Sequence, residues 1–423
     1  MRMSRLQTTV LCLAVLGLRS PDAAAQQDAA AAQAIRQEID QLKKEFEARL
    51  TSLEARLGEI EALRTPAQAA PQPAAGVPPG AAGGPTGTLP VYGNVTAASK
   101  IFNPDIAVIG NFLGAVGPNE IRPEPVLQMP ESEVSLQAIV DPYARADFFL
   151  AFGEEGVDLE EGYVTFPTLP GGLLAKAGKM RSAFGKVNTF HTHVMPWVDR
   201  PLVTDNLVGG EEGLSDAGLS VARLIPNPWV FMEATGQLFR GDANDVFVSS
   251  RRSDVSFTGH LRGYHDLTES ANLDLGASYA FGHNGSGLEE GIDFSTRLYG
   301  IDATFRWRPL QRSIYRSFIG RSEIVWSHRD QPDGRQRALG FFVSGDYQLG
   351  RRWFTGARFD HSDRADDRAL HDTGGSWTLT FWPSEFSQIR GQVRRTRYAE
   401  GPTATELLFQ VLFNIGAHGA HPF

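Results

Sequence analysis

The stretch NLDLGASYAF, residues 272–281, alternates two kinds of side chain along its whole length. Leucine, alanine, tyrosine and phenylalanine occupy one set of alternate positions, and small or polar residues occupy the other. The stretch YGIDATFRWR, residues 299–308, repeats the pattern. Because successive side chains of a β-strand point to opposite faces, this period of two predicts strands with one apolar and one polar face.

The same alternation recurs from about residue 105 to the end of the chain, where it predicts sixteen strands. We expect them at 105–116, 133–140, 143–152, 159–166, 173–180, 216–225, 228–239, 253–264, 271–282, 295–308, 316–328, 338–349, 353–361, 372–382, 386–398 and 404–416. Many of these runs have about ten residues, which is the length of a tilted strand that crosses a bilayer. A soluble β-sandwich would show the same alternation, but its strands are usually shorter.

Two further features favour a membrane barrel over a sandwich. Tryptophans gather at the ends of the expected strands, where the aromatic girdles of such barrels lie; they are Trp229, Trp307, Trp326, Trp353 and Trp382. Tight turns also alternate with longer polar loops, which we place at 117–132, 181–215, 240–252, 283–294, 329–337 and 362–371. Outer-membrane barrels have short periplasmic turns and long external loops. The expected fold class is therefore an all-β transmembrane barrel of about sixteen antiparallel strands, closed so that lipid meets no unpaired strand edge.

Three segments precede the barrel, which we assign to residues 101–423. Residues 1–25 have the basic start, short apolar run and A-x-A site of a signal peptide. They contain Cys12, the single cysteine, so the mature chain has no thiol for disulfides, thiolate zinc sites or nucleophilic catalysis. Residues 26–64 repeat apolar residues at spacings of three and four, which predicts a periplasmic coiled coil, with a lone surface helix as the alternative.

The last of these segments, residues 65–100, is rich in proline, alanine and glycine and predicts an extended linker. The formal net charge of −9 argues against a nucleic-acid partner, which would require a basic excess.

Several short motifs resemble a family of bacterial outer-membrane porin-like proteins, often labelled zinc-regulated or TonB-dependent. These motifs are NPDIAVI at 103–109, VDPY at 140–143, EEGY at 160–163, LAKAGK at 174–179, FG at 184–185, HTH at 191–193, DRPL at 199–202 and GAHGAH at 416–421. The region 162–201 is more loosely similar to the phosphate-selective porins O and P. The resemblance implies a channel in the outer membrane of a Gram-negative bacterium. TonB-dependent transporters are larger barrels with a folded plug, and the segments before this barrel offer nothing to form one.

The long loop at 182–215 is the first candidate site. Loops of this length are uncommon unless they are functional, and in porins such a loop enters the lumen and narrows it. Its candidate constriction residues are Lys186, His191, His193 and Arg200. The alternative is an external loop that only covers the mouth.

Charged residues on the polar face of the strands are expected to line the lumen. They are Arg262, Arg306, Arg321, Arg358, Arg390, Arg394, Asp302, Glu323 and Asp360. Rings of arginine would bias a pore toward anions. Opposite charges could instead pair across neighbouring strands and keep the wall rigid.

Two histidine pairs could offer imidazoles to zinc, which histidine commonly binds. They are His191 with His193 in the loop and His418 with His421 in the tail. The alternative is that these are ordinary loop and tail histidines, and we expect no other cofactor.

The function that follows is passive diffusion of small hydrophilic solutes, with anion preference or metal uptake as finer alternatives. A structural role, tethering the membrane to the cell wall through the coiled coil, is the competing hypothesis. An enzyme is not expected: His260, Ser256 and Asp274 lie near one another in sequence, but no nucleophile motif accompanies them. The expected partners are outer-membrane lipid, two further copies in a homotrimer, and peptidoglycan.

Overall fold

The computed structural model describes Gln41, Lys44 and residues 104–153, 156–290 and 292–416. The chain divides into two compact units, residues 1–92 and 93–423. The predicted signal peptide, almost all of the predicted coiled coil and the linker lie outside the described residues, as do His418 and His421. Within the described part of the chain, no helix is both long and apolar enough to cross a membrane.

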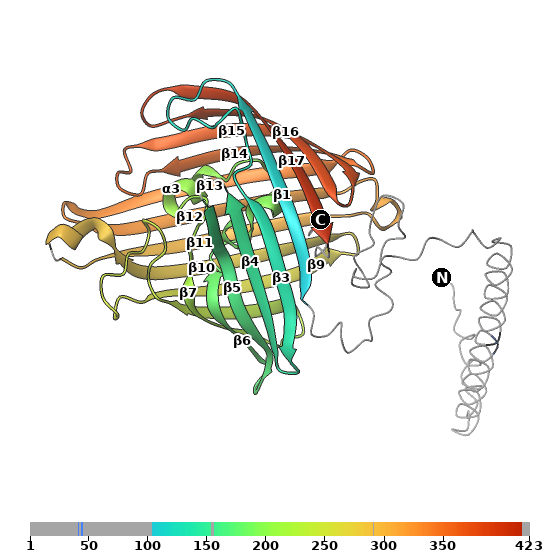
Figure 1. Ribbon diagram of the computed structural model, residues 1–423, viewed down its shortest axis with the longest axis horizontal. Helices are drawn as coiled ribbons and strands as arrows, with labels where there is room; N and C mark the ends of the chain where they lie inside the picture. Colours follow the sequence, from blue (N-terminus) through green and yellow to red (C-terminus); the bar gives the residue numbers. More distant parts are fainter. Residues whose placement is uncertain (1–40, 42–43, 45–103, 154–155, 291, 417–423) are drawn as a thin grey trace, which may run out of the picture. The chain divides into compact units, whose positions relative to one another are not determined.

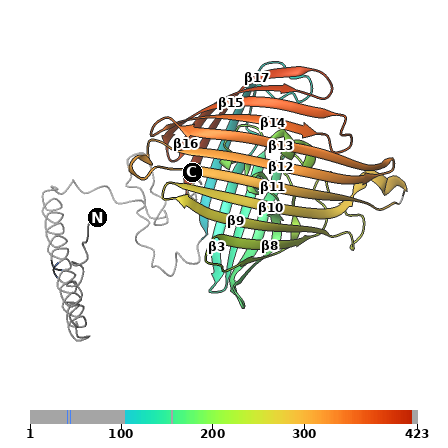
Figure 2. The same cartoon turned by 180° about the vertical axis from the view of Figure 1, so that it is seen from behind.

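The described residues of the second unit form a closed antiparallel β-barrel (Figures 1 and 2). Its sixteen long strands are β1 (Asp105–Val116), β3 (Ser132–Asp141), β4 (Ala144–Gly153), β5 (Gly156–Leu169), β6 (Leu173–Arg181), β7 (Ser215–Leu224), β8 (Phe231–Phe239), β9 (Ser256–Thr268), β10 (Ala271–Asn284), β11 (Phe294–Trp307), β12 (Phe318–Gln331), β13 (Gly334–Gln348), β14 (Trp353–Asp363), β15 (His371–Ser384), β16 (Ser387–Arg397) and β17 (Thr403–Gly416). A two-residue strand, β2 (Leu127–Gln128), pairs with β1. The predicted fold class and number of strands are confirmed.

The first and last long strands close the barrel, because β1 pairs with β17 from Ala107↔Gly416 to Val116↔Leu407. Two glycines of β1 lie opposite phenylalanines of β17 at this seam. A Cβ atom on Gly110 would lie 2.1 Å from Phe413 Cζ, and one on Gly114 would lie 2.0 Å from Phe409 Cε1. Each ring therefore covers a glycine, a pairing that compensates for the missing side chain in a strand.

The two faces of the wall differ as the alternation predicts. On the outer face, Leu275, Ile301 and Trp377 are about half exposed, at 47%, 50% and 50%. Their neighbours Asp274 and Asp302 point inward and are buried. A soluble protein rarely exposes a continuous belt of large apolar side chains, whereas the lipid-facing band of a membrane barrel has this composition.

One predicted loop is wrong. Residues 329–337 form the ends of two strands and a tight turn, because β12 continues to Gln331 and β13 begins at Gly334. An ion pair of 2.6 Å between Arg335 and Asp330 supports this hairpin. The polar composition indicated a loop, but strands β12 and β13 remain paired through their backbones up to Gln331 and Gly334. Backbone pairing does not require apolar side chains where both faces of the strands are in water.

The segment 182–214 between β6 and β7 folds into the barrel. It contains three short helices, η1 (Val187–Thr189), η2 (Thr192–Val194) and α3 (Leu202–Leu207), and α3 lies beside β13 and β14 (Figure 1). Apolar side chains of the segment, including Phe184, Trp197 and Val203, form one buried cluster with Leu298, Val325 and Phe342 of the inner wall. The barrel therefore has a hydrophobic core on part of its inner surface, between the wall and the inserted segment.

Candidate functional site

The inserted segment, residues 182–214, begins with contacts to β10 and β12. The backbone N–H groups of Lys186 and Val187 both donate to Glu323 Oε2, at 3.1 and 3.2 Å. The Lys186 ammonium donates to Asp274 Oδ2 at 2.9 Å. Gly185 has a φ of +61°, and a Cβ there would lie 2.1 Å from Glu323 Oε1. Only glycine fits this approach, which explains the FG motif physically.

Asp199 fastens the middle of the segment to β14 and β16. Its carboxylate accepts hydrogen bonds from Arg358 and Arg394, each at 3.0 Å, and from Gln392 at 2.5 Å. Burial would raise the pKa of Asp199, but the charges of Arg358 and Arg394 outweigh it and lower that pKa to about 2. Three residues on, the backbone N–H of Leu202 donates to Asp360. This part of the segment is held by charge-assisted hydrogen bonds, the stronger kind.

Trp197 and Arg390 make a second fastening nearby. The Trp197 ring is buried, packs edge-on against Phe342 with centroids 5.2 Å apart, and lies 4.8 Å from the Arg358 guanidinium carbon. Arg390 donates to the carbonyl oxygens of Met195 and Trp197, at 2.8 and 3.2 Å. Backbone and side chain of the segment are therefore both fixed to the wall.

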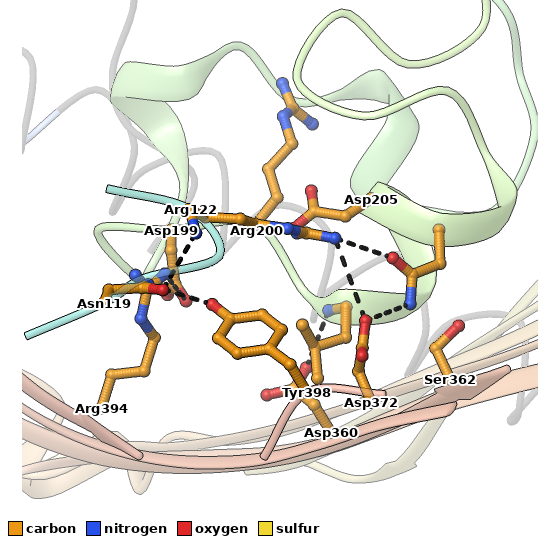
Figure 3. Close-up of polar contacts among 12 residues, drawn as sticks. Asn119, Arg122, Asp199, Arg200, Asp205, Asp360, Ser362, Asp372, Arg394 and Tyr398 are labelled. Atoms are coloured by element: carbon orange, nitrogen blue, oxygen red, sulfur yellow. Dashed lines mark hydrogen bonds and ion pairs between the residues drawn. The ribbon is translucent and has the colours of Figure 1, made fainter. Parts of the chain in front are cut away.

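The external loop 117–131 covers α3 at the mouth. Arg122 donates to Asp205 and Asn206 of α3, both at 2.9 Å, and lies 3.9 Å from Asp372 of β15. In Figure 3 its side chain runs toward Asp205 and Asp372, whereas Arg200 points away from this network. Burial raises the pKa of Asp205 to about 6, although Arg122 opposes the shift.

His191 and His193 lie against glutamates of β3 and β5. His191 Nδ1 is 2.8 Å from Glu133 Oε2 and 2.9 Å from Glu160 Oε2, and its Nε2 is 2.8 Å from Glu161 Oε2. His193 Nδ1 lies 3.3 Å from the same Glu133 oxygen. Burial opposes charge on the His191 ring, but hydrogen bonds with the three glutamates raise the pKa of His191 well above its usual range.

The remaining charged residues expected in the lumen mostly engage partners. Arg262 pairs with Asp274 at 2.7 Å and Arg321 with Asp346 at 2.5 Å, both across neighbouring strands. Asp302 is buried on the inner face of β11, which also carries the partly buried Arg306. Arg200 is buried inside the segment and donates to the Phe190 carbonyl at 3.2 Å. Arg262 and Arg321 therefore contact carboxylates on neighbouring strands, as the pairing interpretation describes.

A cavity of about 640 Å³ lies between residues 193–196 and the inner wall, at the end of the barrel that carries the short turns. Five arginines and two carboxylates bound it: Arg308, Arg321, Arg351, Arg352, Arg390, Asp346 and Glu385. Among the described side chains, none forms an ion pair with Arg308, Arg351 or Arg352. The lining of this cavity therefore holds more arginines than carboxylates.

Sequence reasoning missed Glu133, Glu160, Glu161 and Arg122 as parts of the site. The EEGY motif contains Glu160 and Glu161, but the sequence assigned no role to either residue. Strand alternation places consecutive residues on opposite faces, so Glu160 and Glu161 cannot both be expected in the lumen unless a bulge is known. Such a bulge exists, because Phe149 pairs with Glu161 and Leu150 with Leu159, which leaves Glu160 extra.

No family model matches the sequence. An uncharacterized protein of Aquifex aeolicus (strain VF5) is 30% identical over 336 residues, which cover 69% of each chain. Among solved structures, an anion-selective porin from Comamonas acidovorans is similar with a TM-score of 0.52 and 11% identity, over 74% of this chain and 98% of that one. OprB of Pseudomonas putida has a TM-score of 0.50 and 10% identity, over 75% and 95% of the two chains. The outer-membrane channel DcaP of Acinetobacter baumannii has a TM-score of 0.50 and 9% identity, over 74% and 96%. At these identities, the likeness to solved structures concerns the fold.

Proposed function

This chain belongs to the same family as the Aquifex aeolicus protein and has the fold of bacterial outer-membrane porins, and from this premise we propose that it forms a passive channel for small hydrophilic solutes. The observation that carries the proposal is the segment 182–214, which is fastened to several parts of the inner wall by the contacts of Lys186, His191 and Asp199. A lumen narrowed by a rigid segment passes solutes by size without a moving part.

The residues that line the cavity support a more specific proposal, that the channel prefers anions. Its five arginines exceed its two carboxylates by three charges (5 − 2 = 3), and arginine keeps its charge at any physiological pH. Fixed positive charge along a pore raises the local concentration of anions and excludes cations. Uptake of metal ions is the other finer alternative, and it depends on His191 and His193.

The segments before the barrel extend the proposal. Residues 1–25 would direct export and be removed, the coiled coil at 26–64 would lie in the periplasm, and the linker at 65–100 would connect it to the barrel. A coiled coil needs partner helices, which supports a homotrimer. Contact of the coiled coil with peptidoglycan would add a tethering role to the channel.

Planar-bilayer recording of the purified protein tests the channel. We expect discrete conductance steps and, in a salt gradient, a reversal potential of the sign that denotes anion preference. The double variant Arg351→Glu/Arg352→Glu should move that potential toward cations, whereas Arg368→Glu, in the exposed loop 364–370, should leave it nearly unchanged. Absence of steps from folded protein would overturn the channel and favour the tether.

A further inference from the structure

Glutamate and histidine side chains from three separate segments converge on one point of the inner wall. We propose that Glu133, Glu160, His191 and His193 bind one divalent transition-metal cation of the zinc type. This inference adds a metal site to the proposed channel. It rests on the proposed function in one respect, because the ion must be able to enter the lumen.

The spacing of the donor atoms is the first argument. Glu133 Oε2 lies 2.8 Å from His191 Nδ1 and 3.3 Å from His193 Nδ1, and Glu160 Oε2 lies 2.9 Å from His191 Nδ1. Donor atoms of Glu133, Glu160 and His191 all fall within 4.8 Å of one another. Zinc binds such atoms at about 2.0–2.2 Å, so two of its ligands in a tetrahedral site are about 3.3 Å apart. The three donor pairs at 2.8, 2.9 and 3.3 Å are therefore close to the spacing that a tetrahedral ion requires.

The carboxylate oxygens of Glu160 and Glu161 that face away from His191 accept hydrogen bonds from Arg181. Arg181 donates through its side chain to Glu160 Oε1 and through its backbone N–H, at 2.7 Å, to Glu161 Oε1. Only the second oxygen of each carboxylate is directed toward His191. These supporting bonds orient the carboxylates before any ion arrives, which lowers the entropic cost of binding.

Glu161 supplies the partner that metal-binding histidines usually have. Its Oε2 lies 2.8 Å from His191 Nε2, so an Nε2–H group would donate to it. A carboxylate in this position fixes the tautomer of the ring and leaves the other nitrogen, here Nδ1, free to bind metal. Glu161 is therefore a positioning residue rather than a ligand.

Charge balance also favours a divalent ion. When the imidazoles are neutral, as metal ligands must be, the carboxylates of Glu133, Glu160 and Glu161 outnumber the neighbouring guanidinium of Arg181 by two (3 − 1 = 2) in a largely buried place. Buried charge must be compensated, and a divalent cation would contribute to that compensation.

The ligand types narrow the identity of the ion. Two imidazoles and two carboxylates suit zinc and its transition-metal neighbours. Calcium and magnesium prefer oxygen ligands throughout. The bulge at Glu160 and the inserted position of the HTH motif together create this mixed set, because neither β5 nor the segment 182–214 could supply it alone.

Calorimetric titration of the full chain in detergent with zinc chloride, after removal of metal by a chelator, tests the site. We expect one zinc ion per chain, and loss of that isotherm in His191→Ala/His193→Ala. Glu161→Gln should weaken binding by about 10- to 100-fold without abolishing it. His361→Ala is the matched control, since His361 lies near His371 and Asp363 in another cluster, and it should bind zinc like the wild type.

Each outcome decides the question. An isotherm that survives in the double variant, or that disappears in His361→Ala, would overturn the proposed site. Heat-modified gel mobility confirms that each variant is a folded barrel, so loss of binding is not loss of fold. Conductance is recorded separately without zinc: steps without zinc binding would retain the channel and reject the site, and zinc binding without steps would do the reverse.

Discussion

Asp199 and Arg358 form an ion pair of 3.0 Å inside the barrel, although 159 positions separate them in the chain. Asp199 belongs to the inserted segment and Arg358 to the inner face of β14. Arg358 also pairs with Asp360 at 2.7 Å, a contact within β14 that helps to orient the guanidinium. The pair therefore couples the position of the segment to the geometry of the wall.

Removing the charge of Asp199 should loosen the segment. In Asp199→Asn, Arg358 and Arg394 lose a shared charged acceptor, and we expect the free energy of unfolding to fall by about 1.5–3 kcal/mol, typical of hydrogen bonds to charged groups. The midpoint of the heat-induced gel shift measures stability, and single-channel recording should show noisier or larger steps. Asp245→Asn, at an exposed external position, is the control. Identical recordings from both variants would show that Asp199 does not hold the segment.

The same anchor predicts a response to acid. Because the pKa of Asp199 in the folded chain is about 2, below the ordinary value of 3.8, the folded state binds its proton less readily than the unfolded state. The stabilisation is therefore complete above about pH 4 and is lost as the pH falls toward 2, up to about 2 kcal/mol.

Proteolysis of the segment at a series of pH values, with an acid-active protease, measures this response. Cleavage within 182–214 should rise below pH 4 in the wild type. Asp199→Asn should lack that part of the pH dependence. A variant whose profile parallels the wild type would assign the acid response to other groups.

Trp197 should be the principal apolar anchor. It is 1% exposed and contacts Phe342 and Arg358, so Trp197→Ala should cost about 3–5 kcal/mol through lost burial and a cavity. Trp229 is 78% exposed, and Trp229→Ala should change the unfolding midpoint in detergent far less. Equal effects of the two substitutions would contradict the packing of the segment on the wall.

The cost of placing a charge on the outer face should depend on how deep in the bilayer the substituted residue lies. Ile301 lies near the middle of β11 and is 50% exposed on the outer face. Ile301→Arg should cost about 2–4 kcal/mol in a bilayer, whereas Leu267→Arg, near the end of β9, should cost about 0–1 kcal/mol. Unfolding by urea in lipid vesicles measures both. Equal costs would mean that the apolar belt does not span a membrane.

Much of the barrel follows from the sequence because strand alternation is a local property. In 272–281 each residue shows which face it occupies, and turns such as Asp141-Pro142 mark where the chain reverses. The predicted entry of 182–215 into the lumen rested on loop length and resemblance. A residue-level signal was present as well, since Leu298, Val325 and Phe342 are apolar at inward positions of neighbouring strands. These positions become a patch only when the strands are aligned.

What the sequence determined by itself was therefore the period, number and polarity of the strands, because each depends on neighbours a few residues apart. Tertiary structure alone decided which charges meet. Glu133, Glu160 and His191 come from three distant segments, and their contact depends on a bulge in β5 and on the path of the inserted segment. No local pattern encodes those two features, since the energy that selects them comes from packing between parts of the chain that are remote in sequence.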